Sequence, residues 1–97
     1  MTLTGVADLH THTTASDGLD AHATLVQRAR DVGLAVIAIA DHDTVDAHLT
    51  LSDADTRGVS VIPAIELSAN VGTAEVHILG YFVDPTSKRL ADALAQL

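Results

Sequence analysis

The chain has 97 residues, 47% of them hydrophobic, and its formal net charge is −8. The apolar fraction argues against a disordered chain, and the length fits one small domain or part of a larger one. Cysteine is absent, which excludes a disulfide framework and a zinc site built on thiolates. The acidity argues against binding of duplex nucleic acid, because contact with its phosphates requires a basic face.

The first residues show neither a basic start nor a long apolar stretch, so we expect no signal peptide. The longest apolar run, residues 32–40, has about half of the roughly 20 residues that a membrane helix needs. We therefore expect a cytoplasmic protein that has no membrane partner.

The first half of the chain alternates between strand-like and helix-like apolar patterns. A short strand is predicted at residues 6–12, and a helix at residues 19–32 that Gly33 would end. A strand at residues 35–40 is apolar on both faces, which is typical of a buried parallel strand. A second helix is predicted at residues 44–57.

Turn and cap residues mark the ends of this second helix and the elements that follow it. Asp43 or Thr44 would cap the helix and Gly58 would end it. Two strands, at residues 59–68 and 74–83, would form a hairpin through a loop at residues 70–73. A final helix is predicted from Lys88 to Leu97. The order β-α-β-α-β-β-α indicates an α/β fold.

The predicted elements do not complete a barrel, because three parallel strands and a hairpin cannot close one. The last helix also reaches Leu97 with its apolar face uncovered. We therefore interpret residues 1–97 as part of a larger α/β fold, with no internal domain boundary. A small stand-alone α/β domain is the alternative.

Polar side chains collect at the C-terminal ends of the three predicted parallel strands. His10 and His12 end the first strand, His42 follows the second, and Glu66 lies near the end of the third. These strand ends form the face at which active sites lie in α/β sheets and barrels. Because His10 and His12 are two residues apart on an extended segment, both point to the same side, where they could chelate one divalent ion.

Aspartates accompany these histidines. Asp17 precedes the first predicted helix, where it could be a turn or cap residue as well as a ligand. His42 lies between Asp41 and Asp43, and either could orient its imidazole, a frequent arrangement for metal-bound histidine. Asp43 could equally cap the next helix. We place Asp8 with Asp41 and Asp43 among the carboxylates expected to support the ligands.

Glu66 is the only acid in the apolar stretch 59–67, and a buried carboxylate is costly unless it is paired or bound to a metal. A hairpin that turns at Val71 and Gly72 would place Glu66 directly opposite His77, although a one-residue slip would separate them. The remaining histidines, His22 and His48, lie within predicted helices and are expected at the surface.

The pooled candidates are four imidazoles and two carboxylates: His10, His12, Asp17, His42, Glu66 and His77. This set exceeds what one tetrahedral zinc requires, so we expect two or more divalent ions of Mn, Zn or Fe that share a bridging carboxylate. Clustered divalent ions point to hydrolysis of phosphate esters. One ion can lower the pKa of a bound water while its neighbour stabilises charge on the phosphoryl oxygens.

These residues resemble the polymerase and histidinol phosphatase (PHP) superfamily. Residues 8–18 (DLHTHTTASDG) are similar to its opening motif, and three further motifs follow in order at residues 40–44, 62–66 and 77–81. The segment at residues 77–85 most resembles the branch of small stand-alone phosphoesterases, which includes enzymes acting on nucleoside 3′,5′-bisphosphates and short RNA ends.

The resemblance implies a distorted (β/α)7 barrel with a three-metal cluster, of which this chain would be the N-terminal part. His10 and His12 would bind one metal, and Glu66 would bridge it to a second metal that His77 also binds. Asp17 and His42 would hold the third. The resemblance further implies that a metal-bound hydroxide attacks phosphorus in line, without a separate protein nucleophile.

The expected partner is a small phosphorylated substrate, most simply a nucleotide, and the chain could self-associate through its incomplete barrel. Further family ligands come from later strands, so we expect this chain alone to bind metal weakly and turn over poorly. One alternative is a histidinol-phosphate phosphatase or a polymerase-associated PHP domain, which shares the opening motifs. Another is a non-catalytic fragment that binds metal or oligomerises.

Overall fold

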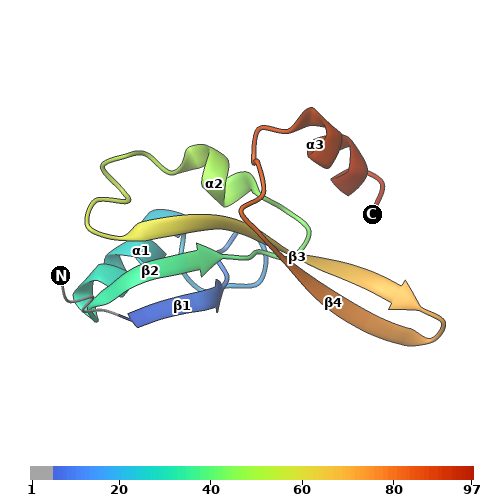
Figure 1. Cartoon of the computed structure of the whole chain (residues 1–97), viewed down its shortest axis with the longest axis horizontal. Helices are drawn as coiled ribbons and strands as arrows, with labels where there is room; N and C mark the ends of the chain where they lie inside the picture. Colours follow the sequence, from blue (N-terminus) through green and yellow to red (C-terminus); the bar gives the residue numbers. More distant parts are fainter. Residues whose placement is uncertain (1–5) are drawn as a thin grey trace.

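The structure is a computed structural model that describes residues 6–97 (Figure 1). Its elements are, in chain order, β1 (Val6–Thr11), α1 (His22–Asp31), β2 (Leu34–Ile39), α2 (Asp46–Thr50), β3 (Ser60–Val71), β4 (Ala74–Tyr81) and α3 (Lys88–Leu94). This is the element order that the apolar pattern predicts, so the α/β prediction is confirmed.

One four-stranded sheet organises the molecule, in the spatial order β1-β2-β3-β4. The first three strands run parallel, and β4 returns antiparallel to β3. Strand β3 is shared between two partners, because residues 60–63 pair with β2 and residues 64–71 pair with β4. The β3–β4 hairpin therefore projects beyond the ends of β1 and β2 (Figure 1).

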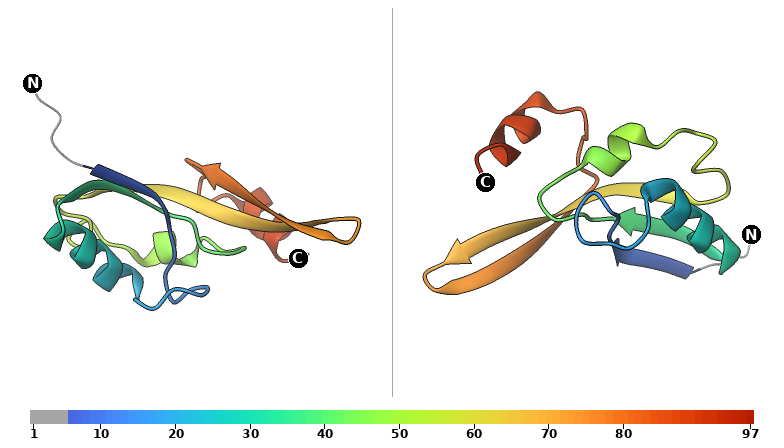
Figure 2. Two further views of the ribbon diagram at one scale, coloured as in Figure 1. Left: turned by 90° about the horizontal axis from the view of Figure 1, so that it is seen from below. Right: turned by 180° about the vertical axis from the view of Figure 1, so that it is seen from behind.

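Helices α1 and α2 lie on the same side of the sheet and bury the main core (Figure 2). Val26 and Ala29 of α1 and Ala47 of α2 pack with Ile37 and Ile39 of β2. Neighbouring strand residues point to opposite faces. The intervening side chains of β2 therefore face away from the helices.

The opposite face is lined by small side chains, and we call it the alanine-lined face. Ala38 and Ala40 form a second buried cluster with Ala64 of β3, and Leu79 of β4 packs against it. Glu66 is two residues from Ala64 on the same strand, so alternation places both on this face. The fold thus presents Glu66 on the side of the sheet away from α1 and α2.

Helix α2 is much shorter than the predicted helix at residues 44–57, and turns follow it. The Ser52 N–H donates to the Asp55 carboxylate at 3.0 Å, and the Asp55 N–H donates to the Ser52 hydroxyl at 3.2 Å. Such local side-chain bonds compete with a helix. Gly58, with φ +81°, therefore lies in a turn before β3 rather than at a helix end.

The other helix ends also differ from the prediction. Helix α1 begins at His22 instead of residue 19, and α3 ends at Leu94 instead of Leu97. The N-cap of α2 is Val45, without a side-chain cap, so Asp43 does not have the predicted capping role. The Thr44 hydroxyl accepts a hydrogen bond at 3.1 Å from the N–H of Asp46, the first residue of α2, so Thr44 supports the start of this helix from one residue before the N-cap. Just beyond α1, Gly33 has φ +85°, which confirms the predicted stop. No helix within residues 6–97 is long and apolar enough to cross a membrane.

The hairpin register is shifted by two residues from the predicted one. Glu66 pairs with Leu79, and His77 pairs with Ser68, because Val71 pairs directly with Ala74. Only Gly72 and Thr73 remain in the loop, and Gly72 takes φ +63°, as tight hairpin turns require. A two-residue shift keeps every side chain on its predicted face. Glu66 and His77 are therefore diagonal neighbours instead of direct partners.

Candidate metal centre

His10 and His12 come from the end of β1, where the strand pairs irregularly with β2. Strand β1 advances from Asp8 to Thr11 while β2 advances only from Ile37 to Ile39, so Leu9 and His10 form a bulge. Bulges are used in proteins to redirect side chains. The two imidazole rings lie with their centroids 5.1 Å apart, as neighbours on one side of the chain.

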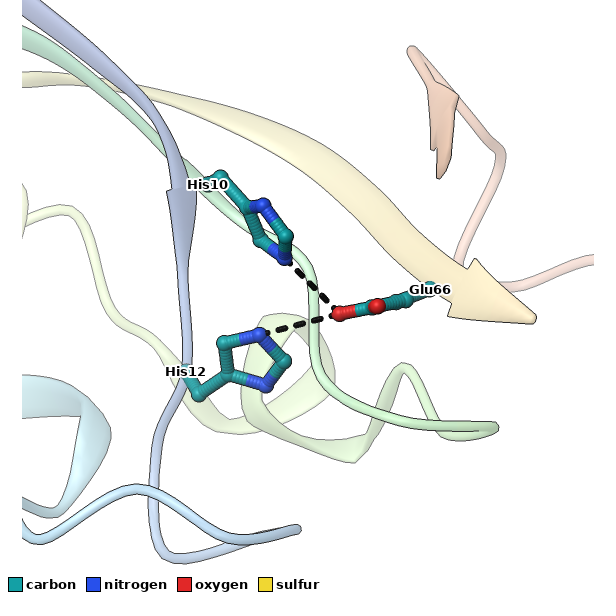
Figure 3. A group of neighbouring side chains, drawn as sticks. All are labelled: His10, His12 and Glu66. Atoms are coloured by element: carbon teal, nitrogen blue, oxygen red, sulfur yellow. Dashed lines mark hydrogen bonds and ion pairs between the residues drawn. The ribbon is translucent and has the colours of Figure 1, made fainter. Parts of the chain in front are cut away.

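Glu66 is the centre of the group, and it is only 7% exposed. Its Oε1 lies 2.8 Å from His10 Nε2 and 3.1 Å from His12 Nε2 (Figure 3). The same oxygen is 3.8 Å from His42 Nε2, and Oε2 is 3.3 Å from His77 Nδ1. One buried carboxylate thus meets imidazoles from β1, from the segment after β2, and from β4.

Backbone hydrogen bonds fix His42 beside Glu66. The Glu66 N–H donates to the Asp41 carbonyl at 3.0 Å, and the Asp43 N–H donates to the Glu66 carbonyl at 3.0 Å. His42 and Glu66 therefore form an isolated parallel bridge beyond the end of β2. Through this bridge, the parallel pairing of β2 and β3 continues as far as His42 and Glu66.

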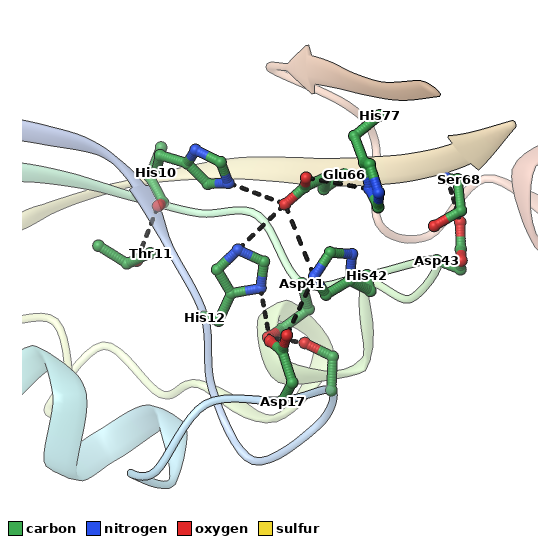
Figure 4. Close-up of polar contacts among 12 residues, drawn as sticks. His10, Thr11, His12, Asp17, Asp41, His42, Asp43, Glu66, Ser68 and His77 are labelled. Atoms are coloured by element: carbon green, nitrogen blue, oxygen red, sulfur yellow. Dashed lines mark hydrogen bonds and ion pairs between the residues drawn. The ribbon is translucent and has the colours of Figure 1, made fainter. Parts of the chain in front are cut away.

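Asp17 joins the group from the loop between β1 and α1. Its Oδ1 lies 3.0 Å from His12 Nδ1, and its Oδ2 lies 3.1 Å from His42 Nε2 (Figure 4). The N-cap of α1 is Ala21, and no side chain caps this helix. The structure therefore places Asp17 against two imidazoles and gives it no capping role.

Asp41 holds the loop that carries Asp17, and it is 1% exposed. Its carboxylate accepts hydrogen bonds from the Thr13 N–H at 2.6 Å, the Thr13 hydroxyl at 2.7 Å and the Ser16 hydroxyl at 2.8 Å. Thr13 and Ser16 were not predicted as site residues. The only sequence signal for them is the hydroxyl-rich run between His12 and Asp17.

The three carboxylates predicted to support the ligands contact backbone and hydroxyl groups instead of imidazole rings. Asp8 accepts a hydrogen bond from the His10 N–H at 3.2 Å. Asp43, at φ +56°, accepts one from the Ser68 N–H at 2.8 Å. The expectation that Asp41 or Asp43 orients the His42 ring is therefore corrected. These carboxylates position the backbone segments on which the histidines and Glu66 lie.

The six predicted ligands form three overlapping sets of donor atoms. Within each set, one atom per residue lies within 4.8 Å of the others. The sets are His10, His12 and Glu66; His12, Asp17 and His42; and His42, Glu66 and His77. All six predicted ligands are thus brought together, from segments far apart in the sequence.

The donor set fits a divalent ion better than it fits internal pairing. His12 Nδ1 is buried and is the one such side-chain atom within residues 6–97 that has no hydrogen-bond partner, although the Asp17 carboxylate is 3.0 Å away. Buried polar atoms normally make hydrogen bonds, so a buried imidazole nitrogen that faces a carboxylate without bonding to it is free to bind a cation. Imidazole and carboxylate donors in this combination suit Zn, Mn or Fe.

The charge on Glu66 is favoured in spite of its burial. Burial raises the pKa of this carboxyl, but the hydrogen bond with His10 and the charges of His42, His10 and His12 outweigh that effect. The pKa of Glu66 is therefore lowered from its ordinary value. An ionised carboxylate at the centre is the form that binds a cation.

His22 and His48 lie outside this group. His48 Nε2 is 2.7 Å from the Ile39 carbonyl oxygen and 3.3 Å from the Ala64 nitrogen, so the half-buried ring links α2 to β2 and β3. The prediction that His48 is a surface residue is therefore wrong. His22 is also half-buried, and its Nε2 lies 3.3 Å from the Thr50 hydroxyl.

Comparison with known proteins gives a consistent family match. The model of the PHP domain family matches residues 8–90. The chain is 39% identical over 94 residues to a 5′-3′ exoribonuclease of Salmonella typhimurium, covering 94% of this chain and 32% of that protein. It is 33% identical over 91 residues to a 3′,5′-nucleoside bisphosphate phosphatase of Chromobacterium violaceum, covering 93% and 32%.

A solved structure supports the same relationship. A Bifidobacterium adolescentis protein, described provisionally as a metal-dependent phosphoesterase, superposes with a TM-score of 0.82 at 34% identity. The match covers 93% of this chain and 32% of that one. The chain thus spans about a third of the length of its relatives. The prediction of a partial α/β barrel is confirmed.

Proposed function

Because the chain belongs to the PHP domain family, we propose that it provides one side of a metal-dependent phosphoesterase site that hydrolyses a phosphate monoester of a nucleotide. The observation that carries this proposal is the group of four imidazoles around buried Glu66, in which buried His12 Nδ1 makes no hydrogen bond. Hydrolysis of phosphate esters is the chemistry that such clustered divalent-ion sites support.

The proposed centre holds two to three divalent ions of Mn, Zn or Fe. His10, His12 and Glu66 would hold one ion, Glu66 and His77 a second, and Asp17 and His42 a third. Bound divalent ions would lower the pKa of water and neutralise negative charge on the phosphate. Overlap of the three donor sets at His12, His42 and Glu66 supports ions close enough to share ligands.

The chain's own side chains orient the site instead of attacking the substrate. The hydroxyls nearest in sequence to His10, His12 and Asp17 are those of Thr11, Thr13 and Ser16. Thr11 donates a hydrogen bond to the Ala38 carbonyl at 2.8 Å, and Thr13 and Ser16 donate to Asp41. All three hydroxyls are therefore committed to structural hydrogen bonds and are not poised as nucleophiles. We propose that water is the nucleophile and that ionised Glu66 keeps the imidazoles gathered around it.

The proposed substrate is a nucleoside 3′,5′-bisphosphate or the end of a short RNA. This choice is supported by the relatives, one named as an exoribonuclease and one as a nucleoside bisphosphate phosphatase. Those names describe proteins of which this chain covers 32%. The net charge of −8 suits a small substrate held through metal ions better than a duplex held by a basic face.

The test combines metal titration with an assay of phosphate release from adenosine 3′,5′-bisphosphate in the presence of Mn²⁺. Wild-type chain is compared with His10→Ala and Glu66→Ala, and with His22→Ala as a matched control outside the ligand group. We expect the first two variants to lose both metal binding and phosphate release, while His22→Ala keeps both.

Two outcomes would count against the proposal. Failure of the wild-type chain to bind Mn²⁺, Zn²⁺ or Fe²⁺ would remove the metal centre altogether. Metal binding with phosphate release that is insensitive to His10→Ala and Glu66→Ala would favour a non-catalytic metal-binding fragment.

A further inference from the structure

Tyr81 connects the two edge strands of the sheet. It is the last residue of β4, pairs with Ala64 of β3, and donates a hydrogen bond from its hydroxyl to the Leu9 carbonyl of β1 at 2.8 Å. Strands β1 and β4 lie at opposite ends of the strand order. The side chain therefore bridges strands that share no ladder hydrogen bonds, which is possible because the sheet curls toward its alanine-lined face.

The acceptor of this bond lies inside the β1 bulge. Leu9 and His10 occupy the stretch in which β1 advances one residue more than β2. A bulge leaves a residue without its normal ladder partner. The Tyr81 hydroxyl satisfies the Leu9 carbonyl at this point, and His10 is the next residue along the chain.

The donor of the bond lies on the strand that carries His77. Alternate residues of β4 point to one face, so His77, Leu79 and Tyr81 lie on the same side as Glu66. His77 Nδ1 is 3.3 Å from Glu66 Oε2, while His10 Nε2 is 2.8 Å from Glu66 Oε1. One hydrogen bond thus ties together the strands that approach Glu66 from opposite sides.

We propose that Tyr81 is a positioning residue for the metal centre. Its hydroxyl holds the β1 bulge in place and so fixes His10 and His12 relative to Glu66 and His77. This inference rests on the proposed metal centre. Loss of the hydroxyl frees the bulge to shift, and metal affinity then falls by roughly 3- to 10-fold, the size of one neutral hydrogen bond.

The test is Tyr81→Phe, which removes only the hydroxyl, beside Phe82→Leu as a control at the neighbouring, 75% exposed aromatic. Each protein is titrated with Co²⁺, whose visible absorption reports both occupancy and the arrangement of ligands. We expect Tyr81→Phe to bind Co²⁺ more weakly and with an altered spectrum, at a nearly unchanged thermal midpoint. Phe82→Leu should match wild type in affinity and spectrum.

Amide hydrogen exchange in the metal-free chain is measured in parallel. We expect Tyr81→Phe to speed exchange at residues 9–12 and nowhere else. Unchanged Co²⁺ affinity and spectrum in Tyr81→Phe, with wild type binding normally, would overturn the assignment. A weaker affinity explained by general loss of thermal stability, with an unaltered spectrum, would also overturn it.

A wild-type chain that binds no Co²⁺ would instead count against the proposed metal centre. In that case the exchange measurement alone tests whether the Tyr81 hydroxyl holds the β1 bulge. Faster exchange confined to residues 9–12 in Tyr81→Phe supports this role, and unchanged exchange overturns it.

Discussion

Glu66 and Asp41 are two buried acids that the fold uses in different ways. Glu66 is surrounded by imidazole nitrogens, whereas Asp41 accepts hydrogen bonds from hydroxyls and a backbone N–H. A carboxylate among hydroxyl donors has its lone pairs satisfied and organises structure. A carboxylate among imidazoles can exchange those contacts for a shared cation. The difference in partners separates a supporting acid from a candidate ligand.

Replacement of Asp41 by Asn should destabilise the fold. The amide keeps one acceptor oxygen but turns a donor NH2 toward the hydroxyl or N–H of Thr13, or toward the Ser16 hydroxyl. Loss of a buried, charge-assisted hydrogen bond costs about 1.5–3 kcal/mol, so we expect a drop of that size in the free energy of unfolding. Urea denaturation monitored by circular dichroism measures it.

Asp53→Asn is the matched control, because Asp53 is exposed and its substitution should leave stability near the wild-type value. An Asp41→Asn variant as stable as Asp53→Asn would show that the Thr13–Ser16 loop does not depend on this carboxylate.

Residue identities predicted which side chains gather at the site, but not their supporting contacts. A histidine pair at a strand end and a lone acid in an apolar strand are local patterns, and the structure brings all six predicted ligands together. The partners of Asp41 depend on how residues 13–16 fold back over the strand ends. No local pattern specifies that path, which is why Thr13 and Ser16 were missed.

At the scale of elements, apolar alternation predicted the order of strands and helices, and local polar chemistry decided their ends. The helix expected to reach Arg57 stops at Thr50, since Ser52 and Asp55 bond to each other's backbone. The hairpin register depended on whether the turn begins at Val71 or Gly72. The β1 bulge had no sequence signal, because it arises from pairing with a strand more than twenty residues away.

In the loop between β1 and α1, Gly18 packs so closely on the His12 backbone that there is no room for a side chain. A Cβ there would lie 2.4 Å from the His12 carbonyl oxygen and 2.5 Å from its carbon, which are backbone atoms that cannot move aside cheaply. Gly18→Ala should therefore displace the loop and with it Asp17. We expect a loss of about 1–3 kcal/mol in the free energy of unfolding, the usual cost of overpacking, measured by urea denaturation.

Gly80→Ala is the control for this prediction, because a Cβ at Gly80 would make only ordinary contact, 3.5 Å from Ile65. It should unfold close to the wild-type midpoint. Equal stability of Gly18→Ala and Gly80→Ala would mean that the loop relaxes without cost. The close packing of Gly18 on His12 would then make no measurable contribution to the free energy of unfolding.

At the scale of the whole molecule, the six candidate ligands form three overlapping donor sets in one group. His12, His42 and Glu66 each belong to two of the three donor sets, so the sets cannot all be filled independently. Two of the five basic side chains are engaged elsewhere, because Arg28 pairs with Asp20 and Arg30 bonds to the carbonyls of Asp55 and Arg57. Among the described residues, no lysine or arginine forms an ion pair with the ligand group.

This arrangement predicts slow turnover by the 97-residue chain alone. Six ligands, three of them shared between donor sets, would hold the ions loosely. No basic side chain would align the phosphate, so the reacting groups would be poorly oriented. Poor orientation alone costs on the order of 100-fold in rate. Phosphate release from adenosine 3′,5′-bisphosphate with saturating Mn²⁺ should therefore be at least about 100-fold slower than for the full-length Chromobacterium violaceum relative assayed beside it. A comparable rate from the monomeric chain would show that the ligands on this side of the centre are sufficient for catalysis.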